Sequence, residues 1–185
     1  IDLAVLKKAL KAISKGITKR IAAPLFLTDH HIKTSLDVFP MEFLDMKENH
    51  VTIFGEDMVA DLAIDTKNLR FVCEEQIKGK LIRIRQAYLE IGLKRKGIEA
   101  LLKESMRSLM TVFRNLVRLK GRAPEKDSAA MLRQLCEEYS LDKEVFLAIY
   151  KDKSNDEKIG SESVEVFLDR YMVELQKLAR LVDKL

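Results

Sequence analysis

The first 20 residues alternate between apolar and basic side chains with the period of an α-helix. Apolar residues recur every three or four positions, with lysines between them, at Leu3, Leu6, Leu10, Ile13 and Ile17. This spacing predicts an amphipathic helix over residues 2–19, with Asp2 as its N-cap. Pro24 ends the predicted helix.

Three short apolar runs follow, and their composition favours β-strands. The predicted strands are Leu25–Thr28, Phe39–Met46 and Val51–Gly55, with Lys47–His50 as the turn between the last two. These strands are too few for an independent sheet. Because the chain also begins at Ile1, inside a predicted helix, we expect a fragment that lacks the first strands of its domain.

From Asn68 onward every segment has helical periodicity. The predicted helices are Asn68–Gly92, Lys96–Leu119, Asp127–Tyr139, Asp142–Lys151 and Ser161–Lys184, with loops at Gly121–Lys126 and Ser154–Gly160. The second of these has a wide apolar arc, which is typical of a central helix in a bundle. The predicted fold is therefore α+β and mainly α, with a partial α/β segment at 1–67 and a helical bundle at 68–185.

Positive charge is concentrated in the first two helices of this bundle. Residues 70–122 hold 14 Lys and Arg against five Glu and no Asp, whereas the whole chain has a net charge of only +4. A concentrated basic face steers anionic partners more effectively than scattered charge does. The sequence thus predicts a helical module that faces an anion.

Other features narrow the class of protein. No apolar run reaches the roughly 18–20 residues of a membrane span, and no signal peptide is visible, so no membrane partner is expected. Cys73 and Cys136 lie within apolar helical patterns, which indicates buried thiols and a reducing, cytoplasmic setting. The three histidines, His30, His31 and His50, have no Cys partner at zinc spacing.

The strongest candidate site lies on the first long helix of the bundle. Lys80 and Arg83 are three residues apart and can contact one anion together, while Arg83 and Arg85 fall on either side of the apolar stripe. Arg70 and Glu74, one turn apart, precede them. The segment is either a wall that binds phosphate or nucleic acid, or a solvated basic face. Gly79, inside the helix, suggests the close approach of another backbone.

A second candidate is Glu42, which the predicted strand Phe39–Met46 places on one face with Leu44 and Met46. A carboxylate among apolar neighbours is a candidate metal ligand or general base, and the alternative is a paired acid at a strand edge. The sequence has no Gly-rich phosphate loop and no nucleophile elbow. These 185 residues therefore contain no complete catalytic constellation.

Four motifs together resemble a group of bacterial and archaeal nucleotidyltransferase-fold proteins of the DNA polymerase β-like superfamily. They are Pro24-Leu-Phe-Leu-Thr28, Asp37-Val-Phe-Pro-Met-Glu-Phe43, Val51-Thr-Ile-Phe-Gly55-Glu-Asp57, and the pattern Leu69-Arg70, Glu74, Gly79-Lys80-Leu81, Arg85 and Tyr88. The resemblance covers most of residues 1–120. It implies an α/β catalytic domain followed by a helical bundle, and Mg²⁺-dependent transfer of a nucleotidyl group from a nucleoside triphosphate.

The motifs that this superfamily uses to bind metal are not in the chain. The Gly-Ser loop and the Asp-x-Asp pair are both missing, as expected of a fragment without its N-terminal part. The resemblance gives Glu42 the place of the third carboxylate if Phe39–Met46 is the equivalent strand, and no carboxylate if Leu25–Thr28 is. The bundle also resembles those of kanamycin-type nucleotidyltransferases and HEPN domains. HEPN ribonucleases need a histidine after an arginine, and no His follows His50.

Two interpretations remain. The first is the C-terminal part of a nucleotidyltransferase, inactive as a fragment, whose basic helices bind a nucleoside triphosphate or another anionic small molecule through Arg70, Glu74, Lys80, Arg83 and Arg85. The second is a non-catalytic helical module that binds RNA or a protein partner. A homodimer formed through the leucine-rich last helix is also open.

Overall fold

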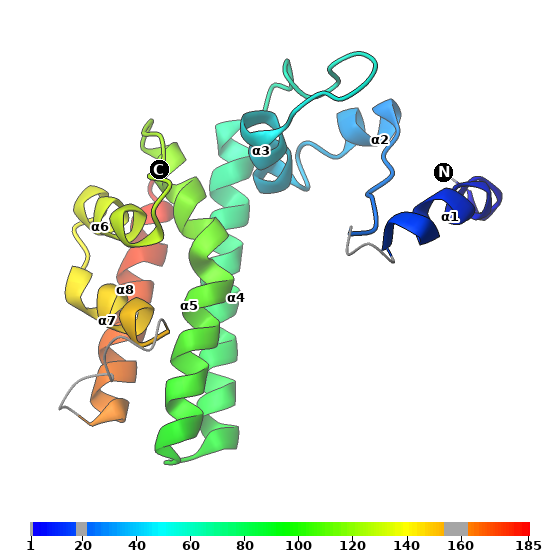
Figure 1. Cartoon of the computed structure of the whole chain (residues 1–185). Helices are drawn as coiled ribbons and strands as arrows, with labels where there is room; N and C mark the ends of the chain where they lie inside the picture. The colour runs from blue at the N-terminus through cyan, green and yellow to red at the C-terminus, as the bar shows by residue number, and fades with distance from the viewer. Residues whose placement is uncertain (1, 18–21, 154–162) are drawn as a thin grey trace.

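The computed structural model describes residues 2–17, 22–153 and 163–185, and this part of the chain is mainly helical, as predicted. Figure 1 shows the long pair α4 and α5, with α6, α7 and α8 on one side and α1, α2 and α3 on the other. The described helices are α1 Leu3–Ile17, α2 Asp29–Thr34, α3 Pro40–Asn49, α4 Thr66–Ile91, α5 Arg95–Leu119, α6 Ser128–Glu138, α7 Lys143–Lys153 and α8 Val164–Val182.

The antiparallel pair α4 and α5 is the scaffold of the bundle, and glycines shape the turn between them. Asp65 caps α4 by accepting a hydrogen bond from a first-turn backbone N–H at 2.8 Å. Gly92 ends α4 with a φ of +64°, a conformation that favours glycine. A Cβ on Gly97 would lie only 2.4 Å from Cγ2 of Ile91, so the two helices come close at this turn only because residue 97 has no side chain.

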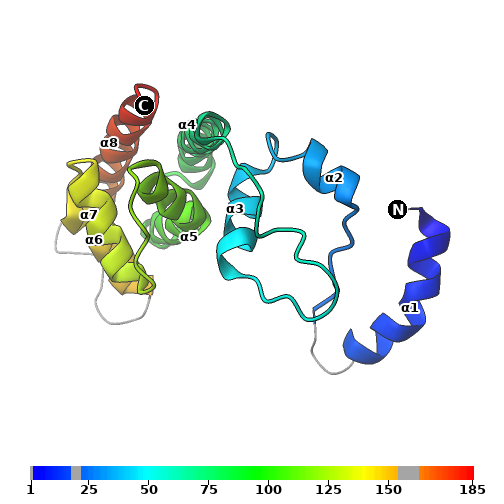
Figure 2. The ribbon, with the colours of Figure 1, turned by 90° about the horizontal axis from the view of Figure 1, so that it is seen from above.

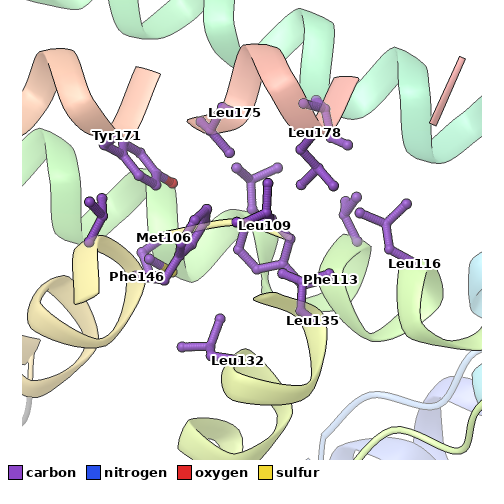
Figure 3. Packing of buried hydrophobic residues seen from close by; sticks show 14 of the residues in the cluster. Met106, Leu109, Phe113, Leu116, Leu132, Leu135, Phe146, Tyr171, Leu175 and Leu178 are labelled. Carbon is purple, nitrogen blue, oxygen red and sulfur yellow. The ribbon is translucent and has the colours of Figure 1, made fainter. Parts of the chain in front are cut away.

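The main core is formed where α4, α6, α7 and α8 pack around α5. Figure 3 shows how side chains of α5, α6, α7 and α8 face one another in this core. The ring of Phe146 lies edge-to-face against Phe113 and Tyr171, at centroid distances of 5.7 and 5.8 Å. The hydroxyl of Tyr171 lies 3.2 Å from Oγ of Ser105, so the buried phenol keeps a polar partner. The central place of α5 confirms the prediction from its wide apolar arc.

A second, smaller core holds α2 and α3 together. Its buried residues are Ile32, Phe43 and Leu62. Nζ of Lys47 donates a hydrogen bond of 2.7 Å to the carbonyl oxygen of Leu62, which fixes the loop after α3 to that helix. α3 also packs against α4 and α5, and its Met41 joins the main core.

The three predicted strands are wrong. Leu25–Thr28 and Val51–Gly55 have no regular secondary structure, and Phe39–Met46 falls mostly within α3. The predicted turn Lys47–His50 is likewise part of α3 up to Asn49. Pro40 occupies the first turn of that helix, where its fixed φ and missing N–H cost nothing. An apolar run of this length does not by itself distinguish a strand from a half-buried helix.

The predicted helices of the bundle are confirmed, with small shifts at their ends. α4 and α5 begin at Thr66 and Arg95, slightly earlier than predicted, and Asp127 serves as the N-cap of α6. α7 extends to Lys153. The described part of the last helix is Val164–Val182, capped by Ser163. The predicted loop 154–160 and the predicted helix start at 161 lie outside the described residues, as do positions 18 and 19 of the first predicted helix.

Candidate functional site

A polar depression of about 190 Å³ lies in the groove between α4 and α5. It is lined by Glu75, Gln76, Gly79, Lys80 and Arg83 from α4, and by Ser108 from α5. Apart from the chain neighbours and the backbone of its own helix turn, no atom lies within 4 Å of the position that a Cβ of Gly79 would take, so the predicted close approach of another backbone there is wrong. The missing side chain of Gly79 leaves space in the depression.

Lys80 and Arg83 bring two positive charges to this depression. They lie about one helical turn apart on the same side of α4. In the described part of the chain neither forms an ion pair, so both charges remain available to a ligand. Ser108 donates its hydroxyl hydrogen to the carbonyl oxygen of Ser105 at 2.8 Å, which leaves lone pairs of Oγ free to accept a hydrogen bond.

Glu75 adds one negative charge to the same depression. One of its carboxylate oxygens accepts a hydrogen bond of 3.4 Å from the side-chain amide of Gln76. The lining therefore carries one acidic and two basic groups, a net charge of +1. This arrangement suits an anion that contacts Lys80 and Arg83 directly and keeps away from Glu75.

Arg85 does not line the depression. At 100° per residue it lies about 140° around α4 from Lys80. It is exposed and has no ion-pair partner among the described residues. The structure thus separates Arg85 from Lys80 and Arg83, as the helical spacing predicts.

Arg70 and Glu74 belong to an ion-pair cluster that joins α4 to the end of α8. Nη1 of Arg70 lies 2.8 Å from Oε2 of Glu74 and donates a hydrogen bond of 3.4 Å to the carbonyl oxygen of Val182. Lys78 pairs with the other oxygen of Glu74 and lies 4.0 Å from Asp183. The hydrogen bond from Lys78 is the largest cause of a lowered pKa of Glu74. These side chains are engaged with one another, which fits a structural role.

Glu42 is exposed in the first turn of α3. Residues two apart on a helix point about 200° apart, so Leu44 does not share its face as a strand would require. Met46, four residues on, lies on the same side of the helix and lines one hollow with Glu42. The predicted strand face is therefore wrong for Leu44 and holds for Met46. No three His, Cys, Asp or Glu side chains converge anywhere in residues 2–17, 22–153 and 163–185. The described residues do not by themselves fit the Mg²⁺ site that the resemblance implies.

Arg118 has a role that the sequence pattern did not predict, and its side chain is only 10% exposed. It pairs with Glu48 of α3 and lies 3.8 Å from Asp45. Its Nη1 also donates a hydrogen bond of 3.0 Å to Oδ1 of Asn115. Its Nε has no partner in the described part of the chain. Arg118 therefore ties α3 to α5. No local sequence signal links positions 48 and 118, because only the packing of the helices brings them together.

The cysteines and histidines supply no nucleophile or metal site in the described residues. Cys73 and Cys136 are free and buried, as predicted, and burial raises the pKa of each thiol to about 12. His30 and His31 are exposed on α2. Nε2 of His50 lies 2.8 Å from Oδ2 of Asp57, and this pair closes the base of the loop between them.

The fold and this depression define a helical-bundle protein with a small basic site between its two longest helices. Comparison with known proteins adds no family to this description: no family model, no curated protein and no solved structure matches the chain. Among the described helices none is both long and apolar enough to cross a membrane.

Proposed function

We propose that this protein binds a phosphate-bearing small molecule of the nucleoside triphosphate class in the depression between α4 and α5. The observation that carries the proposal is the pairing of Lys80 and Arg83 at one depression, with neither cation used by an ion pair among the described residues. Arginine and lysine on one helical face can contact neighbouring oxygens of the same phosphate group. The hydroxyl of Ser108 lines the depression from the second helix. To contact a phosphate oxygen it donates its hydrogen to the ligand in place of the carbonyl oxygen of Ser105.

The role we propose is binding rather than catalysis. The resemblance to nucleotidyltransferase-fold proteins suggests that such a bundle holds the phosphates of a substrate beside a catalytic domain. Glu42 is exposed and no acidic cluster accompanies it in the described residues, so we assign no catalytic step to this chain. In this proposal Lys80 and Arg83 hold the anion, while Arg70 and Glu74 keep α4 in place against α8.

The test is a titration of the purified protein with ATP, inorganic tripolyphosphate and adenosine, followed by calorimetry and by backbone NMR. We expect ATP and tripolyphosphate to bind and to shift the amide signals around Gly79 and Ser108, and adenosine to bind at least tenfold more weakly. The double variant Lys80→Gln, Arg83→Gln should reduce affinity for ATP by about a hundredfold or more, because two lost charged hydrogen bonds at about 1.5–3 kcal/mol each sum to at least about 3 kcal/mol.

Arg85→Gln is the matched control, because it removes one positive charge from the same helix without touching the depression. We expect Arg85→Gln to leave affinity for ATP nearly unchanged. An equal loss in Arg85→Gln and in the double variant would contradict a defined site and indicate attraction to the whole basic surface. Such diffuse attraction, with a steep dependence on salt and no preference for triphosphate, is what the RNA-binding alternative predicts.

A further inference from the structure

The apolar face of α1 is not covered in the structure. Leu3, Leu6 and Leu10 are 66%, 38% and 58% exposed. In the described part of the chain no other helix packs against α1. Figure 2 shows α1 set apart from the bundle, beyond α2 and α3. This helix therefore presents to solvent the apolar side chains that usually hold a helix against a core.

Lysines border the apolar face of α1. At 100° per residue, Leu3, Leu6, Leu10 and Ile13 fall within an arc of about 80°. Lys7 lies about 40° beyond Leu3 at the edge of this arc, and Lys8 lies on the opposite side of the helix. The first 20 residues of the sequence hold six basic residues and one acidic residue. A strong apolar face beside a lysine-rich face is the pattern of helices that lie in the interface of a lipid bilayer.

A second group of apolar side chains lies next to this face. Leu25 and Phe26 are 70% and 42% exposed, and they line a hollow of about 510 Å³ together with Leu6. Leucine and phenylalanine near an amphipathic helix add apolar area that can enter the boundary between headgroups and acyl chains. The exposed apolar surface thus extends beyond α1 itself.

The backbone of α1 is compatible with a lipid environment. Its peptide groups are hydrogen-bonded within the helix, and Asp2 accepts a hydrogen bond of 2.9 Å from the N–H of Val5. A helix of 15 residues without tertiary packing is only marginally stable in water. A surface that covers the leucines would stabilise it. An anionic lipid surface covers the leucines and also attracts the lysines, whereas a purely apolar protein groove would use only half of this pattern.

We propose that α1 lies in the plane of an anionic membrane surface, with Leu3, Leu6 and Leu10 towards the acyl chains and the lysines among the headgroups. In this arrangement α1 lies on the bilayer and does not cross it. The proposal thus departs from the expectation of no membrane partner, which rested on the lack of a membrane-spanning run. The bundle remains in water, with the depression between α4 and α5 open to its ligand. The proposal is independent of phosphate binding, because the two use different residues.

The test is co-sedimentation of the purified protein with two kinds of vesicle. One contains phosphatidylcholine alone, and the other contains equal parts of phosphatidylcholine and phosphatidylglycerol. We expect partitioning into the anionic vesicles to be at least about tenfold stronger, and to fall several-fold in Lys7→Gln, Lys8→Gln, because each basic residue near the surface contributes to binding. The triple variant Leu3→Gln, Leu6→Gln, Leu10→Gln should lose binding to both kinds of vesicle.

The matched control is Val166→Gln, Val173→Gln, which removes two exposed apolar side chains from α8. This variant should bind anionic vesicles like the wild type. Circular dichroism should show a folded bundle in every variant. Titration with ATP measures ligand binding at the depression between α4 and α5 separately. Equal binding of the wild type to both vesicles, no binding to either, or unchanged binding of the triple leucine variant would overturn the proposal. A protein partner that covers the leucines of α1 in the absence of lipid would also overturn the proposal.

Discussion

The contact between His50 and Asp57 shows how two residues can fix a loop without a core. Oδ1 of Asp57 accepts hydrogen bonds from the N–H groups of Val59 and Ala60, while Oδ2 contacts His50. The loop between them carries Ile53 and Phe54, which are 96% and 97% exposed. Because apolar contacts do not hold this loop, its shape depends on the polar pair at its base.

The pH dependence of this pair has a definite sign. The hydrogen bond to Asp57 raises the pKa of His50. The stability that this raised pKa contributes is complete below the pKa of His50 in the unfolded chain, near 6.5, and is lost as pH rises through its pKa in the folded protein. The hydrogen bond from His50 lowers the pKa of Asp57 to about 2. The stability that this lowered pKa contributes is present above the pKa of Asp57 in the unfolded chain, near 3.8, and is lost as pH falls towards 2. The loop should be best fixed between about pH 4 and 6.5.

Asp57→Asn should therefore lower the pKa of His50, because it removes the negative partner. NMR titration of the His50 ring protons measures this directly. Asp61→Asn is the control, since Asp61 is exposed in the same loop region and does not contact His50. If His50 titrates identically in the wild type and in Asp57→Asn, the pair does not form in solution.

At the scale of whole elements, the two glycines Gly79 and Gly97 of the α4–α5 hairpin should respond to alanine substitution with opposite changes in stability. Gly79 lies inside α4 with open space around it, so Gly79→Ala should stabilise the protein by up to about 1 kcal/mol. Gly97 lies in the first turn of α5 against Ile91, so Gly97→Ala should destabilise it by about 1–3 kcal/mol. Urea unfolding of both variants checks the two signs. If Gly97→Ala stabilised the protein, the close contact at the turn would be absent, and if Gly79→Ala destabilised it, the space around Gly79 would be absent.

Whether each of these elements could be predicted depends on how many residues its hydrophobic pattern extends over. The helices of the bundle could be predicted because their apolar residues repeat with helical period over many turns, as in α4 and α5. The run Phe39–Met46 is too short for its period to be decisive, and there the first-turn position of Pro40 was the better signal. Val51–Gly55 has strand-like composition, but no neighbouring strand among the described residues completes a ladder.

The candidate site could be predicted only in part. The proximity of Lys80 and Arg83 follows from their spacing on one helix. The contribution of Ser108 depends on the register between α4 and α5, which the sequence does not encode locally. The engagement of Arg70 with α8, like that of Arg118 with α3, also comes from tertiary packing across long stretches of chain. Sequence reasoning identified the charges but not which of them the fold would neutralise.

At the scale of the whole molecule, the described chain contains two cores that differ in size and are joined through α3. The main core includes Phe146, which is fully buried between aromatic neighbours. The smaller core includes Phe43 and is shielded by few other buried residues. Met41 and the ion pair of Glu48 with Arg118 connect the two. A small core linked by few contacts should open more readily than the bundle.

Two phenylalanine variants test this difference. Phe146→Ala should lower the free energy of unfolding by about 3–5 kcal/mol and speed hydrogen exchange throughout the bundle, because it leaves a cavity in the main core. Phe43→Ala should speed exchange in α2, α3 and residues 59–64, while the amides of α5 keep their protection. Hydrogen exchange measured residue by residue distinguishes these patterns. If Phe43→Ala weakened protection in α5 as much as in α3, the molecule would unfold as one cooperative unit and the smaller core would be an extension of the bundle.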